Sequence, residues 1–576
     1  MRIALVEVKN FRGIKELRWA PSPGINCLIG PGDSTKTTIL DAIELCLNPR
    51  SQGFADDCDF FNLAVQCPVS ITVTLVDLPQ DFTALNRYGP HTRGWNSATA
   101  KLEDEPAAGL DTALSINVQI DASLEPHWSI FNDRIAIDDR DPPTVRYKDA
   151  QLFATTRLGP YAERHLGWGR TSVLTRIADA EANFRLQLAE ASRAAREAFR
   201  SAERSAFAET VNRAQALSKE FAVPVRKAYA AELDVQGVSI SSGGIALHDD
   251  GLPLRTLGTG SSRLIVAALQ SGAQPCRVAL VDEIEHGLEP HRLARLIRHL
   301  KSSRAGCPSS QIFITTHSPI TIRELDAGEI FTVRCEAGQT IVRSASSATS
   351  DAGKVQGHLR RSPEAFLARK VLVAEGRTEM GLALGLDTHW IAKDMASFAL
   401  QGAAAINGGG KDNAPAMADY LLDLGYRVFL LMDSDRNPDD PQVLTRVTDK
   451  GGVVARWPDK CSTEQRIFLD VPWIAVQGLV RFARDCEGDD SVRATINNAL
   501  SARNASEIVE LSLPTSDDTE VFRRAIGDAA KNDNRPWFKT ISRGEQVAAI
   551  ICPHLRAVAK KPLVRTLTQL RAWIDG

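Results

Sequence analysis

Acidic side chains follow two buried-strand segments in the C-terminal third of the chain. An apolar strand ends at Glu375, and Glu379 follows one helical turn later (KVLVAEGRTE). A second apolar strand ends in the pair Asp433 and Asp435 (VFLLMDSD). Carboxylates placed in this way would converge on one crevice, where they can hold hard cations such as Mg²⁺ or Mn²⁺. The pattern therefore predicts a metal centre.

Three further features lie in the same third of the chain. The glycine-rich loop Asn407–Lys411 falls between the two acidic motifs and can approach a phosphate closely. An acid, Glu464, stands near the start of an expected helix (STEQRIFL). Lys539 follows two aromatic residues (WFK), which would fix its position. Each acidic motif alone also fits an ordinary turn or helix start. Their occurrence in this order favours a metal-dependent site.

Near the N-terminus, the loop GPGDSTKTT joins a short apolar strand to an amphipathic helix. Such a loop directs backbone N–H groups at phosphates, Lys36 would reach the β- and γ-phosphates, and Thr37 would bind Mg²⁺. Thr35 stands where the usual pattern has its last glycine, and an unrelated glycine–proline turn is the alternative interpretation. The predicted nucleotide-binding residues are Gly30, Gly32, Lys36, Thr37 and Thr38.

Later segments add parts that ATP hydrolysis needs. An apolar strand (RVALVDE) ends in Asp282, a candidate Mg²⁺ ligand, and Glu283, which would lie beside the attacking water. A small-residue segment, LGTGS, precedes an expected helix, and His317 follows another strand, where contacts to the γ-phosphate are made. Each piece alone fits a solvated turn. Their order along the chain is what predicts an ATPase.

This order resembles that of the ABC-type ATPases of the SMC, Rad50 and RecF group. The resemblance implies ATP–Mg²⁺ as a cofactor and a homodimer with composite sites. It also implies that Gly260 and Ser261 cap the γ-phosphate of a partner subunit, although Gly258 occupies the usual serine position.

The acidic motifs resemble the Toprim domain of topoisomerases, primases and overcoming lysogenization defect (OLD) nucleases. The resemblance implies that Glu375 acts at the metal centre or in proton transfer, that Asp433 and Asp435 hold metal, and that Lys539 stabilises charge on the scissile phosphate. The whole chain is similar to OLD-family ATP-dependent endonucleases, and most of all to the nuclease subunits of Gabija antiphage systems. A two-metal site would then use Glu375, Glu379, Asp433 and Asp435, with Glu464 as a further ligand.

These motifs require an α/β fold in several domains. We expect an ABC-type ATPase domain with a helical insertion, followed by a Toprim α/β domain. Neither Gly nor Pro occurs between Thr171 and Val223, which predicts the helical insertion. The expected segments are an ATPase N-lobe (1–170), a helical or dimerisation insertion (171–231), an ATPase C-lobe (232–345), a linker (346–364) and the nuclease domain (365–576).

Composition restricts the functional class. The chain has 576 residues, a net charge of −3 and 43% hydrophobic residues, so it is no basic DNA-coating protein. It shows no signal-peptide core, membrane span or CxxC pair, and we expect a cytoplasmic protein. The predicted function is nucleotide-regulated DNA cleavage in antiphage defence, by a homodimer or higher homo-oligomer with a helicase-like or other partner from a defence operon. The alternatives are a DNA-repair ATPase with a Toprim scaffold and an RNA-cleaving effector.

Overall fold

The computed structural model describes the chain except for residues 49–55, 135–142, 160–161, 169–171, 175–180, 202–204, 222, 224, 234–244, 273–277, 307–309, 347–351 and 533. Parts of the predicted helical insertion and of the predicted linker lie outside the described residues. The chain forms two compact units. The larger unit comprises Ile3–Val145 and Thr315–Gly576, and the smaller comprises Met1–Arg2 and Arg146–Ile314.

A mixed sheet forms the first part of the larger unit. Its strand order is β6-β5-β7-β4-β1-β2-β15-β14-β3, with β8 beside β7. The apolar strand β3 is entirely buried and runs parallel to β14, so the loop that follows β3 begins at a fixed place. The strands are β1 (Arg2–Phe11), β2 (Ile14–Trp19), β3 (Ile25–Ile29), β4 (Val69–Val76), β5 (Arg93–Asn96), β6 (Lys101–Glu103), β7 (Asp111–Ile120), β8 (Pro126–Phe131), β14 (Ile330–Glu336) and β15 (Gln339–Ser344). The helices are α1 (Lys36–Leu47), α2 (Gln80–Thr83) and α10 (Pro319–Glu324).

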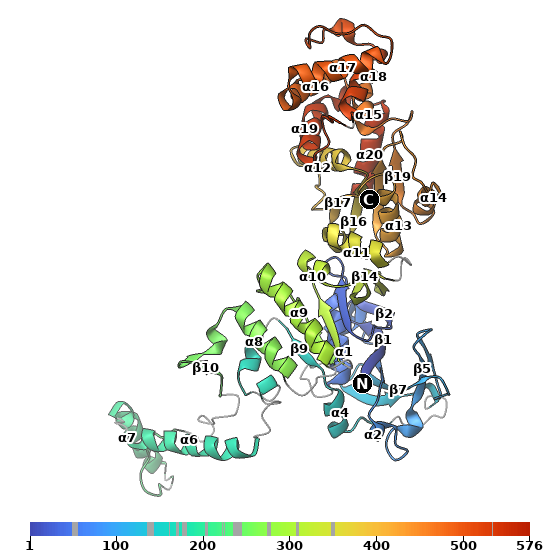
Figure 1. Cartoon of the computed structure of the whole chain (residues 1–576). Coiled ribbons are helices and arrows are strands. Elements are labelled where there is room, and N and C mark those ends of the chain that lie inside the picture. The colour runs from blue at the N-terminus through green and yellow to red at the C-terminus, as the bar shows by residue number, and fades with distance from the viewer. Residues whose placement is uncertain are drawn as a thin grey trace. The chain divides into compact units, whose positions relative to one another are not determined.

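A second, parallel sheet forms the C-terminal part of the same unit, in the order β17-β16-β18-β19 (Figure 1). Because these strands are parallel, their carboxyl ends share one edge, and the residues after β16, β17 and β18 meet there. The strands are β16 (Lys370–Ala374), β17 (Ala403–Asn407), β18 (Arg427–Met432) and β19 (Val453–Arg456). The accompanying helices are α11 (Ala352–Arg361), α12 (Arg377–Ile391), α13 (Asn413–Asp423) and α14 (Gln442–Asp449).

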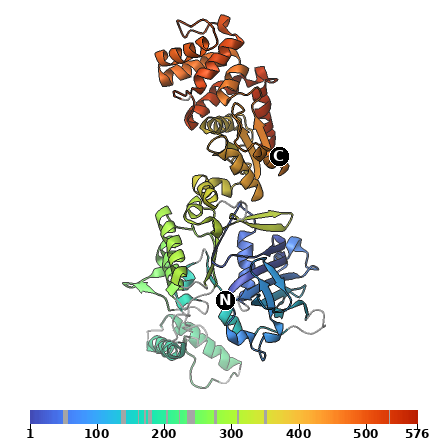
Figure 2. The same ribbon diagram turned by 45° about the vertical axis from the view of Figure 1, so that its right-hand side comes forward.

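Helices follow this sheet toward the C-terminus, drawn in orange to red in Figure 2, and they pack around a hydrophobic core that contains several Trp and Phe side chains. The close pair is α12 with α19. A Cβ at Gly381 would lie 2.2 Å from the carbonyl oxygen of Ile541, so these helices touch through glycine. The helices are α15 (Thr463–Asp470), α16 (Trp473–Glu487), α17 (Asp489–Ser501), α18 (Glu520–Lys531), α19 (Ile541–Ile551) and α20 (Pro562–Asp575).

We expect Gly381→Ala to destabilise the chain by about 1–3 kcal/mol, because the added methyl group meets backbone atoms that cannot rotate away. Urea unfolding measures this change. The matched control is Gly357→Ala in α11, where no atom lies within 4 Å of the added Cβ. That control gains helix propensity and should be neutral or slightly stabilising. Equal stability of the two variants would contradict the packing described here.

The two sheets of the larger unit meet through β14 and the turn between α13 and β18. The Thr332 hydroxyl on β14 donates to the carbonyl oxygen of Leu424 at 3.4 Å, and the Tyr420 hydroxyl donates to Ala345 at 2.9 Å. The Arg334 guanidinium lies 3.9 Å from the ring centroid of Tyr426. β14 therefore pairs with β3, the strand before the phosphate loop, and its side chains contact the turn that leads into β18 of the C-terminal sheet. We call these contacts the β14 junction.

The smaller unit carries a parallel set of strands in the order β13-β12-β9. Its strands are β9 (Thr156–Leu158), β10 (His248–Asp249), β11 (Leu252–Pro253), β12 (Val278–Val281) and β13 (Gln311–Thr315). Its helices are α4 (Tyr147–Phe153), α6 (Glu181–Ser201), α7 (Ser205–Glu220), α8 (Thr259–Gly272) and α9 (Pro290–Gly306). Across the described residues of both units, no helix has both the length and the apolar character that crossing a membrane requires.

Candidate functional site

A cavity of about 370 Å³ lies at the carboxyl edge of the parallel sheet. It is lined by the glycine-rich loop after β17, by the residues after β16 and β18, and by the start of α15. Five acidic side chains from the predicted set share it: Glu375, Glu379, Asp433, Asp435 and Glu464. The predicted Lys539 also lines it.

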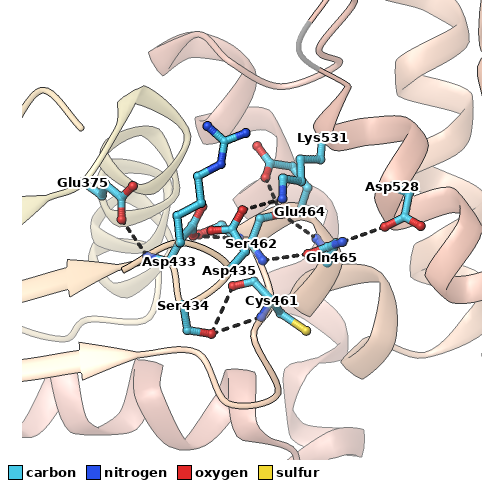
Figure 3. Close-up of polar contacts among 12 residues, drawn as sticks. Glu375, Asp433, Ser434, Asp435, Cys461, Ser462, Glu464, Gln465, Asp528 and Lys531 are labelled. Carbon is cyan, nitrogen blue, oxygen red and sulfur yellow. Dashed lines mark hydrogen bonds and ion pairs between the residues drawn. The ribbon is translucent and has the colours of Figure 1, made fainter. Parts of the chain in front are cut away.

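Backbone geometry fixes the centre of this cluster. The backbone N–H of Asp433 donates to Glu375 Oε2 at 2.9 Å, which joins the ends of the two strands (Figure 3). Asp433 Oδ1 in turn accepts from the N–H and the hydroxyl of Thr463, each at 2.8 Å. Thr463 opens α15, so the negative charge of Asp433 lies at a helix N-terminus.

Two further carboxylates are almost fully buried beside it. Glu379 and Glu464 are 4% and 3% exposed. Glu379 Oε2 accepts from the N–H of Gly376 at 2.8 Å. Glu464 accepts from the hydroxyls of Thr378 at 3.1 Å and Ser462 at 3.0 Å.

Burial and mutual repulsion raise the pKa values of this cluster. Burial, reinforced by the charge of Glu464, raises the pKa of Glu379 to about 7. Burial and the charges of Glu379 and Glu464 raise the pKa of Asp433 well above its ordinary value. Burial also raises the pKa of Glu375. The cluster therefore carries negative charge at a cost, which a bound cation would reduce.

The donor set fits a hard divalent cation, because it consists of carboxylate oxygens. Among the described residues, no three acidic, histidine or cysteine groups already converge as a formed metal site. The carboxylates instead accept hydrogen bonds from backbone and hydroxyl groups. Binding would replace some of these hydrogen bonds with bonds to the cation and leave the strand ends in place.

In metal-free protein, stability should fall as pH rises from about 4.5 to about 7. Folded Glu379 retains its proton up to a pKa of about 7, whereas an unfolded glutamate releases it near 4.5. The folded state binds more protons in this window, so the free energy of unfolding decreases with pH. Urea midpoints at pH 5 and pH 8 in chelator would measure this. Glu379→Gln should flatten the dependence, and an unchanged slope in that variant would contradict the assignment.

Sequence reasoning missed three positively charged residues that line the cavity, Arg377, Arg436 and Lys531. Lys531, the last residue of α18, forms an ion pair with Asp435. No sequence motif surrounds Lys531. The only feature that could have indicated it is its position at the end of an amphipathic helix. Lys539 stands directly after Trp537 and Phe538, each 1% exposed and packed in the aromatic core, so its backbone position is fixed.

The phosphate loop occupies residues 30–38 between β3 and α1. A Cβ at Gly30 would lie 2.5 Å from the carbonyl oxygen of Val333, so only glycine fits there, whereas Gly32 has open space around it. The Lys36 ammonium donates to the carbonyls of Gly30 and Pro31 and to the Ser34 hydroxyl, at 2.8 to 3.1 Å. Thr37 and Thr38 follow in the first turn of α1.

Thr35 adopts the left-handed conformation that its glycine-like position requires, with φ 67° and ψ 14°. For a β-branched residue this costs about 1–2 kcal/mol. The Thr35 hydroxyl offsets part of the cost through contacts with the Ser34 carbonyl at 2.6 Å and the Thr340 hydroxyl at 3.1 Å. The sequence departure therefore keeps the loop shape.

The acid pair after β12 belongs to the smaller unit. Asp282 is 5% exposed and pairs with Arg157 at 2.7 Å, while Glu283 is exposed. The fully buried Arg263 donates to the backbone carbonyls of both acids, at 2.9 and 3.0 Å. Arg263 lies on α8, so the helix that carries the small-residue segment also positions the acid pair.

Helix α8 begins at Thr259, three residues earlier than the expected start at Ser262. Gly260 and Ser261 thus lie in its first turn rather than before it. A Cβ at Gly260 would lie 2.1 Å from the carbonyl oxygen of Gly287, so this turn packs closely on the loop after the acid pair. His317 is exposed after β13, next to Ser318, which caps α10, and it belongs to the larger unit.

Known families match both halves of the chain. Residues 1–127 match an AAA ATPase domain, and residues 102–323 match the AAA domain of the AbiEii toxin, type IV TA system. Residues 366–435 match the TOPRIM domain of overcoming lysogenization defect protein-like proteins. The chain thus joins an ATPase-type domain to a C-terminal TOPRIM domain. This combination matches the ATPase–TOPRIM proteins of the OLD family, as predicted.

Curated relatives match over a short segment. The DNA replication and repair protein RecF of Prosthecochloris aestuarii (strain DSM 271 / SK 413) is 48% identical over 66 residues, which is 12% of this chain and 18% of that protein. RecF of Chlorobium phaeobacteroides (strain BS1) is 39% identical over 62 residues, 11% of this chain and 17% of that protein.

Solved structures that match include SMC head domains. The one from Thermotoga maritima is 15% identical with a TM-score of 0.29, covering 60% of this chain and 99% of that chain. A head domain bound to the C-terminal domain of ScpA derived from Pyrococcus furiosus is 13% identical with a TM-score of 0.34, covering 60% and 97%.

Proposed function

We propose that this chain is a nucleotide-regulated, metal-dependent DNA endonuclease. The observation that carries the proposal is the shared cavity with its five carboxylates and Lys539 at the carboxyl edge of the TOPRIM sheet. A purely structural domain gains nothing from burying mutually repelling acids, because each ionised group costs desolvation energy there. A site that binds cations and phosphate explains the cost.

The roles follow from position. Glu375, Glu379, Asp433 and Asp435 would hold two Mg²⁺ or Mn²⁺ ions, with Glu464 supporting them. Such ions supply an activated water and charge stabilisation at the leaving oxygen. Lys539 would donate to a non-bridging oxygen of the scissile phosphodiester. The loop Asn407–Lys411 would bring backbone N–H groups to the neighbouring phosphate.

The ATPase region would regulate this cleavage. Lys36 and Thr37 would bind ATP–Mg²⁺ together with Asp282, and Glu283 would orient water. Gly260 and Ser261 would cap the nucleotide of a second copy, which requires a homodimer or higher homo-oligomer. His317 would contact the γ-phosphate.

A role in bacterial antiphage defence, in the cytoplasm and with an operon partner, fits the family matches. One matched model takes its description from a toxin–antitoxin system, and the other from lysogenization-related proteins. The similarity to RecF supports a second candidate, a DNA-repair ATPase whose TOPRIM part is a scaffold. That candidate predicts DNA-stimulated ATP hydrolysis without strand cleavage.

Purified full-length protein decides between them. Supercoiled plasmid and a structured RNA are incubated side by side with Mg²⁺ or Mn²⁺, with and without ATP and EDTA. We expect plasmid cleavage that EDTA abolishes. Cleavage of RNA alone would establish an RNA-directed effector, and ATP hydrolysis without cleavage would establish the scaffold.

A further inference from the structure

The cavity contains an ion pair between a lysine and a carboxylate of the proposed metal site. Lys531 at the end of α18 binds Asp435 (Figure 3). The Asp435 side chain is 14% exposed and the Lys531 side chain 29%, so water only partly screens the pair. The ammonium thus occupies the carboxylate oxygen that a cation would use.

The position of Lys531 is fixed by the helix that also fixes Asp433. Gln465 of α15 donates to Asp528 of α18 at 2.6 Å, three residues before Lys531. Arg503, just after the end of α17, also binds Asp528, at 2.5 Å. The same α15 begins with Thr463, whose N–H and hydroxyl hold Asp433. The contact between α15 and α18 therefore fixes the position of Lys531, and α18 contributes this residue directly to the site.

The Lys531–Asp435 ion pair sets Asp435 apart from the other carboxylates of the cavity. The other four carboxylates in the cavity accept hydrogen bonds from the backbone or from hydroxyl groups, and three of them have raised pKa values. Asp435 differs from them in that an ion pair with the Lys531 ammonium balances its negative charge. A divalent cation at Asp435 would compete with the ammonium for this carboxylate, because both positive groups are attracted to the same negative charge.

We propose that Lys531 is a positioning residue that holds Asp435 in the cavity and competes with a divalent cation for its carboxylate. The proposal rests on the proposed nuclease function. When Asp435 binds metal, its bond to the ammonium breaks, and Lys531 is released next to the cavity, where a DNA phosphate oxygen can accept its hydrogen bond. The lysine thereby couples occupancy of the second metal position to substrate binding.

The test measures metal binding in place of cleavage. Mn²⁺ is titrated into nucleotide-free, full-length protein, and free Mn²⁺ is counted by electron paramagnetic resonance. Lys531→Met should bind the second ion about 10-fold more tightly or better, because one competing positive charge is gone. Lys531→Arg should stay within about 3-fold of wild type, since it preserves the charge. Lys560→Met, on an exposed lysine, is the matched control and should not change affinity.

A double-mutant cycle identifies the partner. In Asp435→Asn the gain from Lys531→Met should vanish, because the carboxylate for which the two cations compete is absent. Unchanged or weaker Mn²⁺ binding by Lys531→Met overturns the proposal, and so does a gain that persists in Asp435→Asn. If wild type binds no Mn²⁺, or if Asp433→Asn binds it as well as wild type does, both the lysine proposal and the proposed nuclease function fail. Normal wild-type binding without any Lys531 effect overturns the lysine proposal alone.

Discussion

Asp433→Asn should abolish DNA cleavage, by at least about 10³-fold, while DNA binding remains. The N–H and the hydroxyl of Thr463 hold the Asp433 carboxylate, and the backbone N–H of Asp433 donates to Glu375 at the neighbouring strand end. The amide keeps the shape and can still accept one hydrogen bond, but it removes the negative charge that a cation requires. Plasmid nicking in Mg²⁺ or Mn²⁺ and a gel-shift assay in chelator measure the two effects separately.

The fold of this variant should be intact, and its thermal stability in chelator should equal or exceed that of wild type. Replacing a buried acid with an amide relieves repulsion from Glu379 and Glu464. Asp449→Asn, at an exposed helix end, is the matched control and should cleave normally. Cleavage by Asp433→Asn at the wild-type rate would remove the TOPRIM cavity from the mechanism.

Lys36→Ala should weaken ATP binding by about 10²-fold and uncouple cleavage from nucleotide. The ammonium is buried at the centre of the phosphate loop, where it already contacts two loop carbonyls and a hydroxyl. ATP phosphates would accept those same hydrogen bonds and gain a charge-assisted contact. Equilibrium binding of a fluorescent ATP analogue measures the loss, and phosphate release measures turnover.

The effect on cleavage separates regulation from catalysis. If nucleotide controls the nuclease, plasmid cleavage by Lys36→Ala should no longer depend on ATP concentration, while its basal rate stays measurable. Lys9→Ala, on an exposed face of β1, should leave both responses unchanged. An ATP response that persists in Lys36→Ala would place nucleotide control elsewhere in the chain.

Local patterns were sufficient for the α/β class and for the ATPase–TOPRIM order, both of which are confirmed. Strand ends followed by acids locate Glu375 and Asp433 because parallel strands must bring their carboxyl ends to one edge. The aromatic pair before Lys539 predicted a fixed position for this lysine, because large apolar side chains tend to be buried and so hold the adjacent backbone in place. Their chemical roles remain predictions.

Residues that reach a site through long-range packing could not be predicted from the sequence. Lys531 enters the cavity only because α18 packs on α15 through Gln465 and Asp528, a contact between residues 63 positions apart. Arg263 reaches the acid pair from a helix whose start was expected three residues later. Side chains recruited in this way carry no local signature, since their neighbours in sequence lie on the opposite side of the helix.

The β14 junction has a consequence for how such chains diversify. The buried Tyr420 donates its hydroxyl to the carbonyl of Ala345, which directly follows β15 and lies outside the residues that match the TOPRIM domain. A TOPRIM domain exchanged from a relative would leave this hydroxyl unmatched unless the β14–β15 hairpin came with it. Successful recombination should therefore cross over before Ile330, so that the hairpin and the nuclease are inherited together.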